Sequence, residues 1–211
     1  MERLELLAVV DEMRQGGDFL SLQETLNLRH RGNVVYDPFS TLISRYVQIA
    51  SGNTFYPGTI LRADANSRFS IDSENVFHAG TLMEALSGGA IVIGNGNIFG
   101  DGGFKARADG AGSRILIGDR GRYNSGAAVY GSSDLGSGSQ ILGLIAVSDC
   151  VLEGGEDFTQ PDPDKRGAVL KGYGAARKLH LAVGEVAFGR SRFEQAAIQR
   201  QTDFHPKTPA G

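Results

Sequence analysis

Apolar residues recur every six positions through the middle of the chain, a spacing that fits neither an α-helix nor an ordinary strand. Four segments share an isoleucine followed six residues later by an aromatic residue: Ile49 and Phe55, Ile71 and Phe77, Ile93 and Phe99, Ile117 and Tyr123. Glycine follows each isoleucine after nine residues, at Gly58, Gly80, Gly102 and Gly126. Of the fifteen positions that this pattern defines between 49 and 147, only Lys105 is neither apolar nor aromatic. The pattern predicts a repeated structural unit.

A six-residue period is typical of a chain coiled into a three-sided prism, with one inward side chain on each short side and a tight corner between sides. A single coil cannot cover its own apolar face, so coils must stack, and like residues then lie above like. Glycine at the corners supplies a positive φ without steric cost. The alternative is a glycine-rich β-sandwich in which the spacing is a coincidence.

The repeat resembles the hexapeptide-repeat family, whose members fold as left-handed parallel β-helices and usually assemble as trimers. The resemblance implies an all-β fold, with short N-terminal and C-terminal helices beside the β-helix, and a homotrimer. We expect about five or more coils, with the four aromatic residues of the repeat in one vertical stack: Phe55, Phe77, Phe99 and Tyr123.

The chain divides into three parts by pattern. Residues 1–34 form an N-terminal helix and lead-in, with apolar residues on one helical face over 1–15. Residues 35–188 form the β-helix, which a polar loop at 153–167 interrupts. Residues 189–211 form a C-terminal helix, expected over 191–201 because a serine precedes helix formers, and a tail.

The six-residue step is broken three times, always after the third side of a coil. Leu61 to Ile71 and Met83 to Ile93 each span ten residues, and Lys105 to Ile117 spans twelve. The three insertions must therefore stack at one corner of the prism. They bring charged residues towards one edge, where loops on a rigid scaffold often carry function: Arg62, Asp64, Glu84, Arg107 and Asp109.

Composition narrows the class of protein. Glycine supplies 30 of 211 residues, roughly twice ordinary usage, yet 41% of the chain is hydrophobic, which argues against disorder. The 21 basic and 24 acidic residues give a net charge of −3, which argues against nucleic acid or an anionic membrane as the main partner. With one cysteine, Cys150, no apolar run of about 18 residues and an acidic N-terminus, we expect a cytoplasmic protein.

Within the superfamily, residues 49–84 resemble the γ-class carbonic anhydrase-like branch. Arg62-Ala63-Asp64 matches the arginine-x-aspartate turn of that branch, and Asn66 follows as in many members. The resemblance implies an Arg62–Asp64 ion pair at a subunit interface beside the metal site. The positions of the three zinc histidines, however, fall on Glu84, Asp101 and Ala106, and none of the four histidines matches a ligand position. Because such zinc needs three nitrogen donors, we expect no metal and no carbonic anhydrase activity.

Acid–base chemistry is still available at this edge. His78 follows Phe77 at a corner and should point outward, so it is a candidate general base beside Glu84 or Asp64. The alternative for His78 is an interface histidine that only forms hydrogen bonds. Candidate substrate-binding residues are Arg62, Arg107, Asp101, Lys105, Tyr123 and Asn124.

Two of these residues have competing interpretations. Either the coil is distorted at Lys105, or Lys105 turns into the cleft beside Asp101 or extends its amine from a core position to water. Tyr123 is also interpreted as the top of the aromatic stack. Scattered basic residues elsewhere are interpreted as solvated surface: Arg166, Lys171, Arg177 and Lys178.

Three functions remain open. The first is a metal-free enzyme of carbonic anhydrase-like descent, acting on a small anionic or acyl substrate at the trimer interface. The second is a CoA-dependent acyltransferase, the commonest activity in the wider superfamily. The third is a non-catalytic scaffold subunit.

Overall fold

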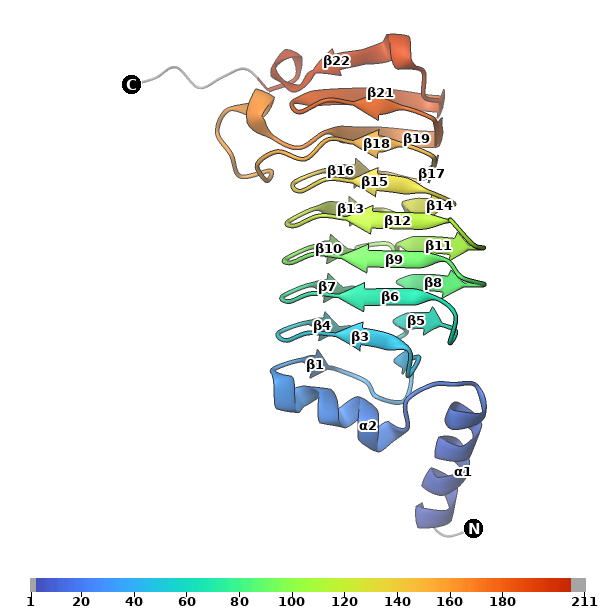
Figure 1. The fold of residues 1–211 in the computed structure, drawn as a ribbon. Coiled ribbons are helices and arrows are strands. Elements are labelled where there is room, and N and C mark those ends of the chain that lie inside the picture. The colour runs from blue at the N-terminus through green and yellow to red at the C-terminus, as the bar shows by residue number, and fades with distance from the viewer. Residues whose placement is uncertain (1–2, 206–211) are drawn as a thin grey trace.

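Two helices lie beneath the β-structure, and the second of them runs across its lower end (Figure 1). They are α1 (Arg3–Gly16) and α2 (Leu22–Asn27), which continues into the 3₁₀ helix η1 (Leu28–Arg31) in this computed structural model of residues 3–205. Ser21 begins α2 through a capping box with Glu24. Arg14 anchors α1, because its buried guanidinium donates to Leu20 O at 2.7 Å and to Thr41 O at 2.9 Å. The predicted N-terminal helix is therefore present.

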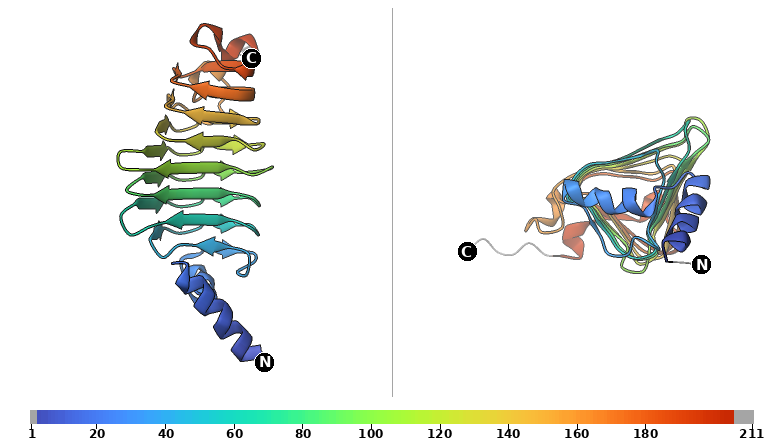
Figure 2. Two further views of the ribbon diagram at one scale, coloured as in Figure 1. Left: turned by 90° about the vertical axis from the view of Figure 1, so that its right-hand side faces the viewer. Right: turned by 90° about the horizontal axis from the view of Figure 1, so that it is seen from below.

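The strands wind upward around three flat faces, each a ladder of parallel strands (Figures 1 and 2). The first face holds β1 (Val34–Val35), β4 (Thr54–Phe55), β7 (Val76–Phe77), β10 (Ile98–Phe99), β13 (Arg122–Asn124), β16 (Gln140–Leu142), the start of β19 (Val169–Arg177) and β21 (Glu185–Arg192). The second face holds β2 (Leu42–Ile43), β5 (Ile60–Ala63), β8 (Leu82–Leu86), β11 (Lys105–Asp109), β14 (Ala128–Tyr130), β17 (Ile145–Ser148) and the end of β19. The third face holds β3 (Val47–Ile49), β6 (Arg68–Ile71), β9 (Ala90–Ile93), β12 (Arg114–Ile117), β15 (Ser133–Leu135), β18 (Val151–Leu152) and β20 (His180–Leu181).

This mostly parallel β-solenoid confirms the predicted β-helix and fits a hexapeptide-repeat fold. The predicted aromatic stack is also present, since Phe55, Phe77, Phe99 and Tyr123 pair in register on the first face and are fully buried. Successive ring centroids lie 5.0, 5.1 and 5.4 Å apart. Stacking like residues above like thus builds one continuous core along the solenoid axis.

Lys105 does not occupy an inward position, contrary to the sequence pattern. The register pairs Ala106, not Lys105, with Met83 and Val129 in the core column, and Lys105 is exposed. This coil has one residue more between Phe99 and β11 than the coil below it has between Phe77 and β8. The core position of β11 is therefore taken by the residue after Lys105. Phe104 fills the corner that results, with its ring 5.2 Å from Phe99 and 5.6 Å from Tyr123.

The three insertions stack at one corner, as the spacing predicts. They form the connections β5 to β6, β8 to β9 and β11 to β12, which project together between the second and third faces (Figure 2, right). Paired strands extend into this corner, where Ala63, Ala85 and Ala108 form a small buried column. The corner is therefore a rigid ridge built from β-structure.

A ladder of buried asparagines lies at the corner before the first face, and sequence analysis did not single it out. The Oδ1 atoms of Asn33, Asn53 and Asn75 accept the backbone N–H of the asparagine one coil above at 2.8, 2.9 and 2.9 Å. Asn97 continues the ladder to Gly121 N at 2.7 Å. The side chains satisfy backbone groups that the tight corner leaves unpaired, which a buried turn requires.

The C-terminal end differs from the prediction. Residues 191–201 form no α-helix: 3₁₀ turns η3 (Gln195–Ala197) and η4 (Gln201–Asp203) flank β22 (Ile198–Arg200), which pairs antiparallel with β21. Pairing with an open sheet edge overrides the helix propensity of this segment. Gln201, the last residue of the expected helix, is buried. Residues 206–211 of the expected tail lie outside the described residues.

The remaining 3₁₀ element of the described residues, η2 (Pro163–Lys165), lies in the polar loop at 153–167. Within residues 3–205, no helix has both the length and the apolar character needed to cross a bilayer.

Candidate functional site

The second face carries an outward ladder of three charged side chains on adjacent coils. Arg62 in β5, Glu84 in β8 and Arg107 in β11 pair in register, so they alternate in charge up the face. One Glu84 carboxylate oxygen lies 3.5 Å from Arg62 Nη1, and the other lies 3.9 Å from Arg107 Nε. We call these three residues the Arg–Glu–Arg ladder.

Exposure differs along the ladder. The Glu84 side chain is 18% exposed, whereas those of Arg62 and Arg107 are 54% and 50% exposed. Arg107 also donates to Asp109 at 2.8 Å, while Glu84 is the only ion-pair partner of Arg62 among the described residues. The ladder therefore presents a partly covered carboxylate between two guanidinium groups that keep donors facing outward, the donor type that binds carboxylates and phosphates.

Asp64 has a structural role at the inserted corner. Its carboxylate accepts from Ser87 N at 2.6 Å, Ser67 Oγ at 2.8 Å and Asn66 N at 3.0 Å. These hydrogen bonds, that from Ser87 most of all, lower the pKa of Asp64. Asp64 thus fastens one corner loop to the loop of the next coil, and within one chain Arg62 pairs with Glu84 and not with Asp64.

His78 lies at another corner, where the first face turns into the second. Its ring stacks on Tyr56 with centroids 4.7 Å apart, and Tyr56 in turn contacts Tyr36 at 4.9 Å. Above it Gly100 has φ +110°, and a Cβ there would lie 2.5 Å from His78 Cβ. Among the described residues no hydrogen bond or ion pair joins His78 to Glu84 or Asp64, so ion pairs connect the ladder and not the whole predicted set.

The remaining predicted residues have mainly structural surroundings. Tyr123 is fully buried, with its hydroxyl 3.0 Å from Ser139 Oγ, and burial raises its pKa. Tyr123 therefore presents no surface to a substrate in this structure, and its interpretation as a stack residue is confirmed. The Asn124 amide donates to Gly100 O at 2.7 Å, and Asp101 occupies a turn at φ +51°.

The zinc positions inferred from the resemblance are also separated by the fold. Ala106 points into the core at 1% exposure, whereas Glu84 and Asp101 are on the surface. Across the part of the chain that the structure describes, no three histidine, cysteine, aspartate or glutamate side chains gather in a metal-binding arrangement.

Sequence analysis missed a cavity of about 400 Å³ on the upper part of the first face. Its lining includes Arg122, Gln140 and Phe188 from the strands, Phe158 and Arg166 from the polar loop, and Phe204 from the C-terminal segment. Segments far apart in the sequence form these walls, so no spacing rule connects them. Arg166 and Lys171, interpreted from sequence as solvated surface, both line the cavity.

Comparison with known proteins adds no relative: the chain matches no protein-family model, no curated protein and no solved structure.

Proposed function

We propose that the chain is a metal-free enzyme that acts on a small anionic or acyl substrate at the Arg–Glu–Arg ladder, where copies of the chain meet as a homotrimer. The observation that carries the proposal is the position of Glu84 between Arg62 and Arg107 on the outward side of the second face. The resemblance to the γ-class carbonic anhydrase-like branch supports the same location.

Each ladder residue has a distinct role in this proposal. Arg62 and Arg107 bind the carboxylate, phosphate or developing oxyanion through charge-assisted hydrogen bonds. Glu84 accepts or donates the proton, because it is the titratable acid in contact with both anion-binding groups. His78 and Asp64 leave the catalytic set, since His78 stacks on Tyr56 and Asp64 is used by the corner turn.

The same face supports assembly. Above the ladder, Tyr130, Leu144 and Tyr173 line one shallow groove and are 42%, 68% and 54% exposed. Exposed aromatic and aliphatic side chains grouped on one surface favour a protein interface. A partner covering this groove would enclose the ladder and exclude water from it. We place the protein in the cytoplasm, where the free Cys150 thiol stays reduced.

The test uses hydrolysis of p-nitrophenyl acetate, an acyl probe, by purified protein. We expect Glu84→Gln to lower turnover by about 10²–10⁴-fold, and Arg62→Ala or Arg107→Ala to raise KM. Arg68→Ala, an exposed arginine on the third face, is the matched control and should leave turnover unchanged. Full turnover in Glu84→Gln would overturn the assignment of the proton-transfer group.

Two other outcomes separate the alternatives. Turnover that appears only with acetyl-CoA and an acceptor would support the acyltransferase. A stable trimer without turnover of either probe would support the scaffold subunit.

A further inference from the structure

The cavity on the first face is partly open to solvent and has a mainly apolar lining. Two segments fold over the outward side of β13, β16, β19 and β21, at the upper left of the solenoid in Figure 1. One segment is the polar loop, which contributes Phe158 and Arg166, and the other is the C-terminal segment after β22. Apolar floor and wall side chains are supplied by Leu142, Val169, Val186, Phe188 and Phe204.

Charge in this cavity has one sign. Arg122, Arg166 and Lys171 line it, and no aspartate or glutamate does so among the described residues. The Arg122 guanidinium lies 4.2 Å from the centre of the Phe158 ring, and neither Arg122 nor Lys171 has an ion pair within residues 3–205. Two uncompensated cations beside apolar surface favour an anionic group on a ligand.

Gln140 adds an independent sign of a ligand site. It is 6% exposed and lines the cavity, yet its side-chain amide makes no hydrogen bond to any described residue. Gln201, also buried in the lining, behaves differently, because its Nε2 donates to Gly167 O at 2.9 Å. An amide that lines a cavity without a protein partner can pair with a bound molecule, and Gln140 therefore offers its N–H donors and its carbonyl acceptor to an occupant.

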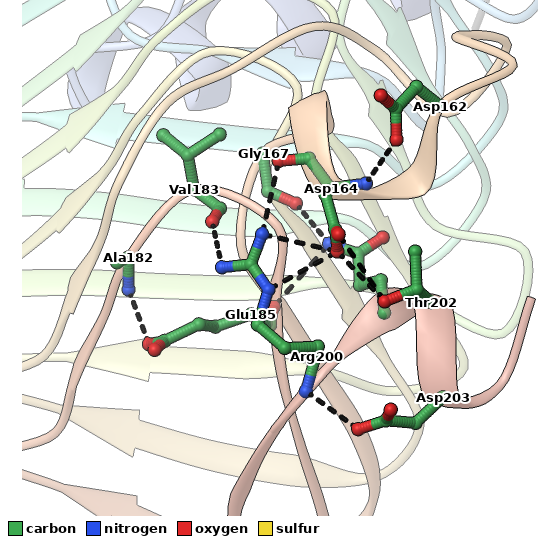
Figure 3. Close-up of polar contacts among 10 residues, drawn as sticks. Asp162, Asp164, Gly167, Ala182, Val183, Glu185, Arg200, Thr202 and Asp203 are labelled. Carbon is green, nitrogen blue, oxygen red and sulfur yellow. Dashed lines mark hydrogen bonds and ion pairs between the residues drawn. The ribbon is translucent and has the colours of Figure 1, made fainter. Parts of the chain in front are cut away.

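A polar cluster holds the C-terminal wall in place (Figure 3). Asp164, from the polar loop, binds Arg200 at 3.1 Å and Thr202 Oγ1 at 3.2 Å. Arg200 also donates to Val183 O at 3.0 Å. These contacts tie the two covering segments to each other and to the top coil, so the cavity is formed before any ligand arrives, which lowers the cost of binding.

We propose that this cavity binds a small amphipathic anion, with an apolar acyl or aromatic body and one carboxylate or phosphate group. The body lies on the Leu142, Val169 and Phe188 floor, and the anion faces Arg122 and Lys171. A polar group of the ligand pairs with the Gln140 amide. The site is separate from the Arg–Glu–Arg ladder, and no carboxylate lines it within residues 3–205, so the role we propose for it is binding.

The experiment is isothermal titration calorimetry with octanoate and with 1-naphthoate, which represent the flexible and the aromatic form of such a ligand. We expect saturable binding of at least one probe at one site per chain, and no saturable binding of acetate or inorganic phosphate. Lys171→Met, which keeps the apolar stem and removes the charge, should weaken binding about ten- to hundredfold. Gln140→Leu should weaken it by a smaller factor.

Arg68→Met is the matched control and should bind like the unmodified chain. Glu84→Gln should also bind normally, so failure of this proposal and failure of the proposed enzyme can be told apart. The proposal would be overturned if neither probe gave saturable binding heat. It would also be overturned if Lys171→Met, Arg122→Met and their double variant all bound the probe as tightly as the unmodified chain. Circular dichroism of each variant checks that the fold is kept.

Discussion

Asp64 shows how a single polar residue in this chain stabilises a corner of the solenoid through hydrogen bonds. Its residue type and position fit a catalytic carboxylate, but its oxygens are occupied by Ser87, Ser67 and Asn66. Sequence could place Asp64 at the inserted corner, because the spacing fixes the corner. It could not show that the neighbouring loop supplies the donors, because that pairing depends on the register of two coils.

The lowered pKa of Asp64 predicts a pH dependence of stability. A carboxyl group whose folded-state pKa lies below its unfolded value stabilises the fold above the unfolded pKa, near 4 for aspartate, and loses this contribution as pH falls through the folded pKa. The unmodified chain should therefore exceed Asp64→Asn in free energy of unfolding at pH 7, and the difference should shrink below about pH 4. Urea unfolding at several pH values measures this difference in the free energy of unfolding, with Asp72→Asn as the exposed control. A difference that stays constant with pH would contradict the prediction.

Asn75 should be more sensitive still. It bonds Asn53 below, Asn97 above and Gly94 O at 2.9 Å, all in a fully buried position. Asn75→Leu keeps the size of the side chain but leaves its buried hydrogen-bond partners unpaired. Because each unpaired buried group costs about 1–3 kcal/mol, we expect the free energy of unfolding to fall by about 2–4 kcal/mol. Chemical denaturation checks this value, with exposed Asn66→Ala as the control; an equal loss in both variants would contradict the ladder's role.

At the scale of elements, the apolar period predicts strand positions well because each inward side chain must meet its copy in the next coil. The six-residue period gives the wrong inward residue in the coil that has one extra residue before Phe104. The helix prediction fails at β22, because pairing with β21 replaces the local preference of that segment for a helix. Similarly, the sequence predicts that Arg62, Glu84 and Arg107 share an edge but not that they form a ladder, since that requires the cross-coil register.

The aromatic stack predicts how much one of its rings contributes to the stability of the core. Phe77→Ala removes a ring that contacts Phe55 and Phe99 at 5.0 and 5.1 Å and leaves a cavity that the closed prism cannot fill. We expect a loss of about 3–5 kcal/mol in the free energy of unfolding. Phe39→Ala, at a site 61% exposed, should change it by less than about 0.5 kcal/mol. Comparable losses from the two changes would argue against the stack as the centre of the core.

For the whole molecule, the proposed trimer has a defined mass. Three chains of 22.4 kDa give about 67 kDa by light scattering. Because Leu144 and Tyr173 are exposed on the groove above the ladder, Leu144→Glu should lower the mass towards that of one chain, whereas Phe39→Glu, on a different part of the surface, should not. A monomer at micromolar concentration in the unmodified chain would contradict the interface.

The antiparallel direction of β22 limits how far the solenoid can grow. Every coil of a parallel stack offers its upper edge as a template for the next coil, whether that coil belongs to the same chain or to a neighbour. β22 covers the Glu185–Arg192 strand at Glu185, Val186 and Ala187 and runs against it, so an incoming parallel strand finds those groups already bonded. α2 lies below the solenoid and β22 pairs with three residues of its top strand, so part of each end of the described chain is unavailable to a neighbouring copy that would otherwise extend the stack towards a fibre.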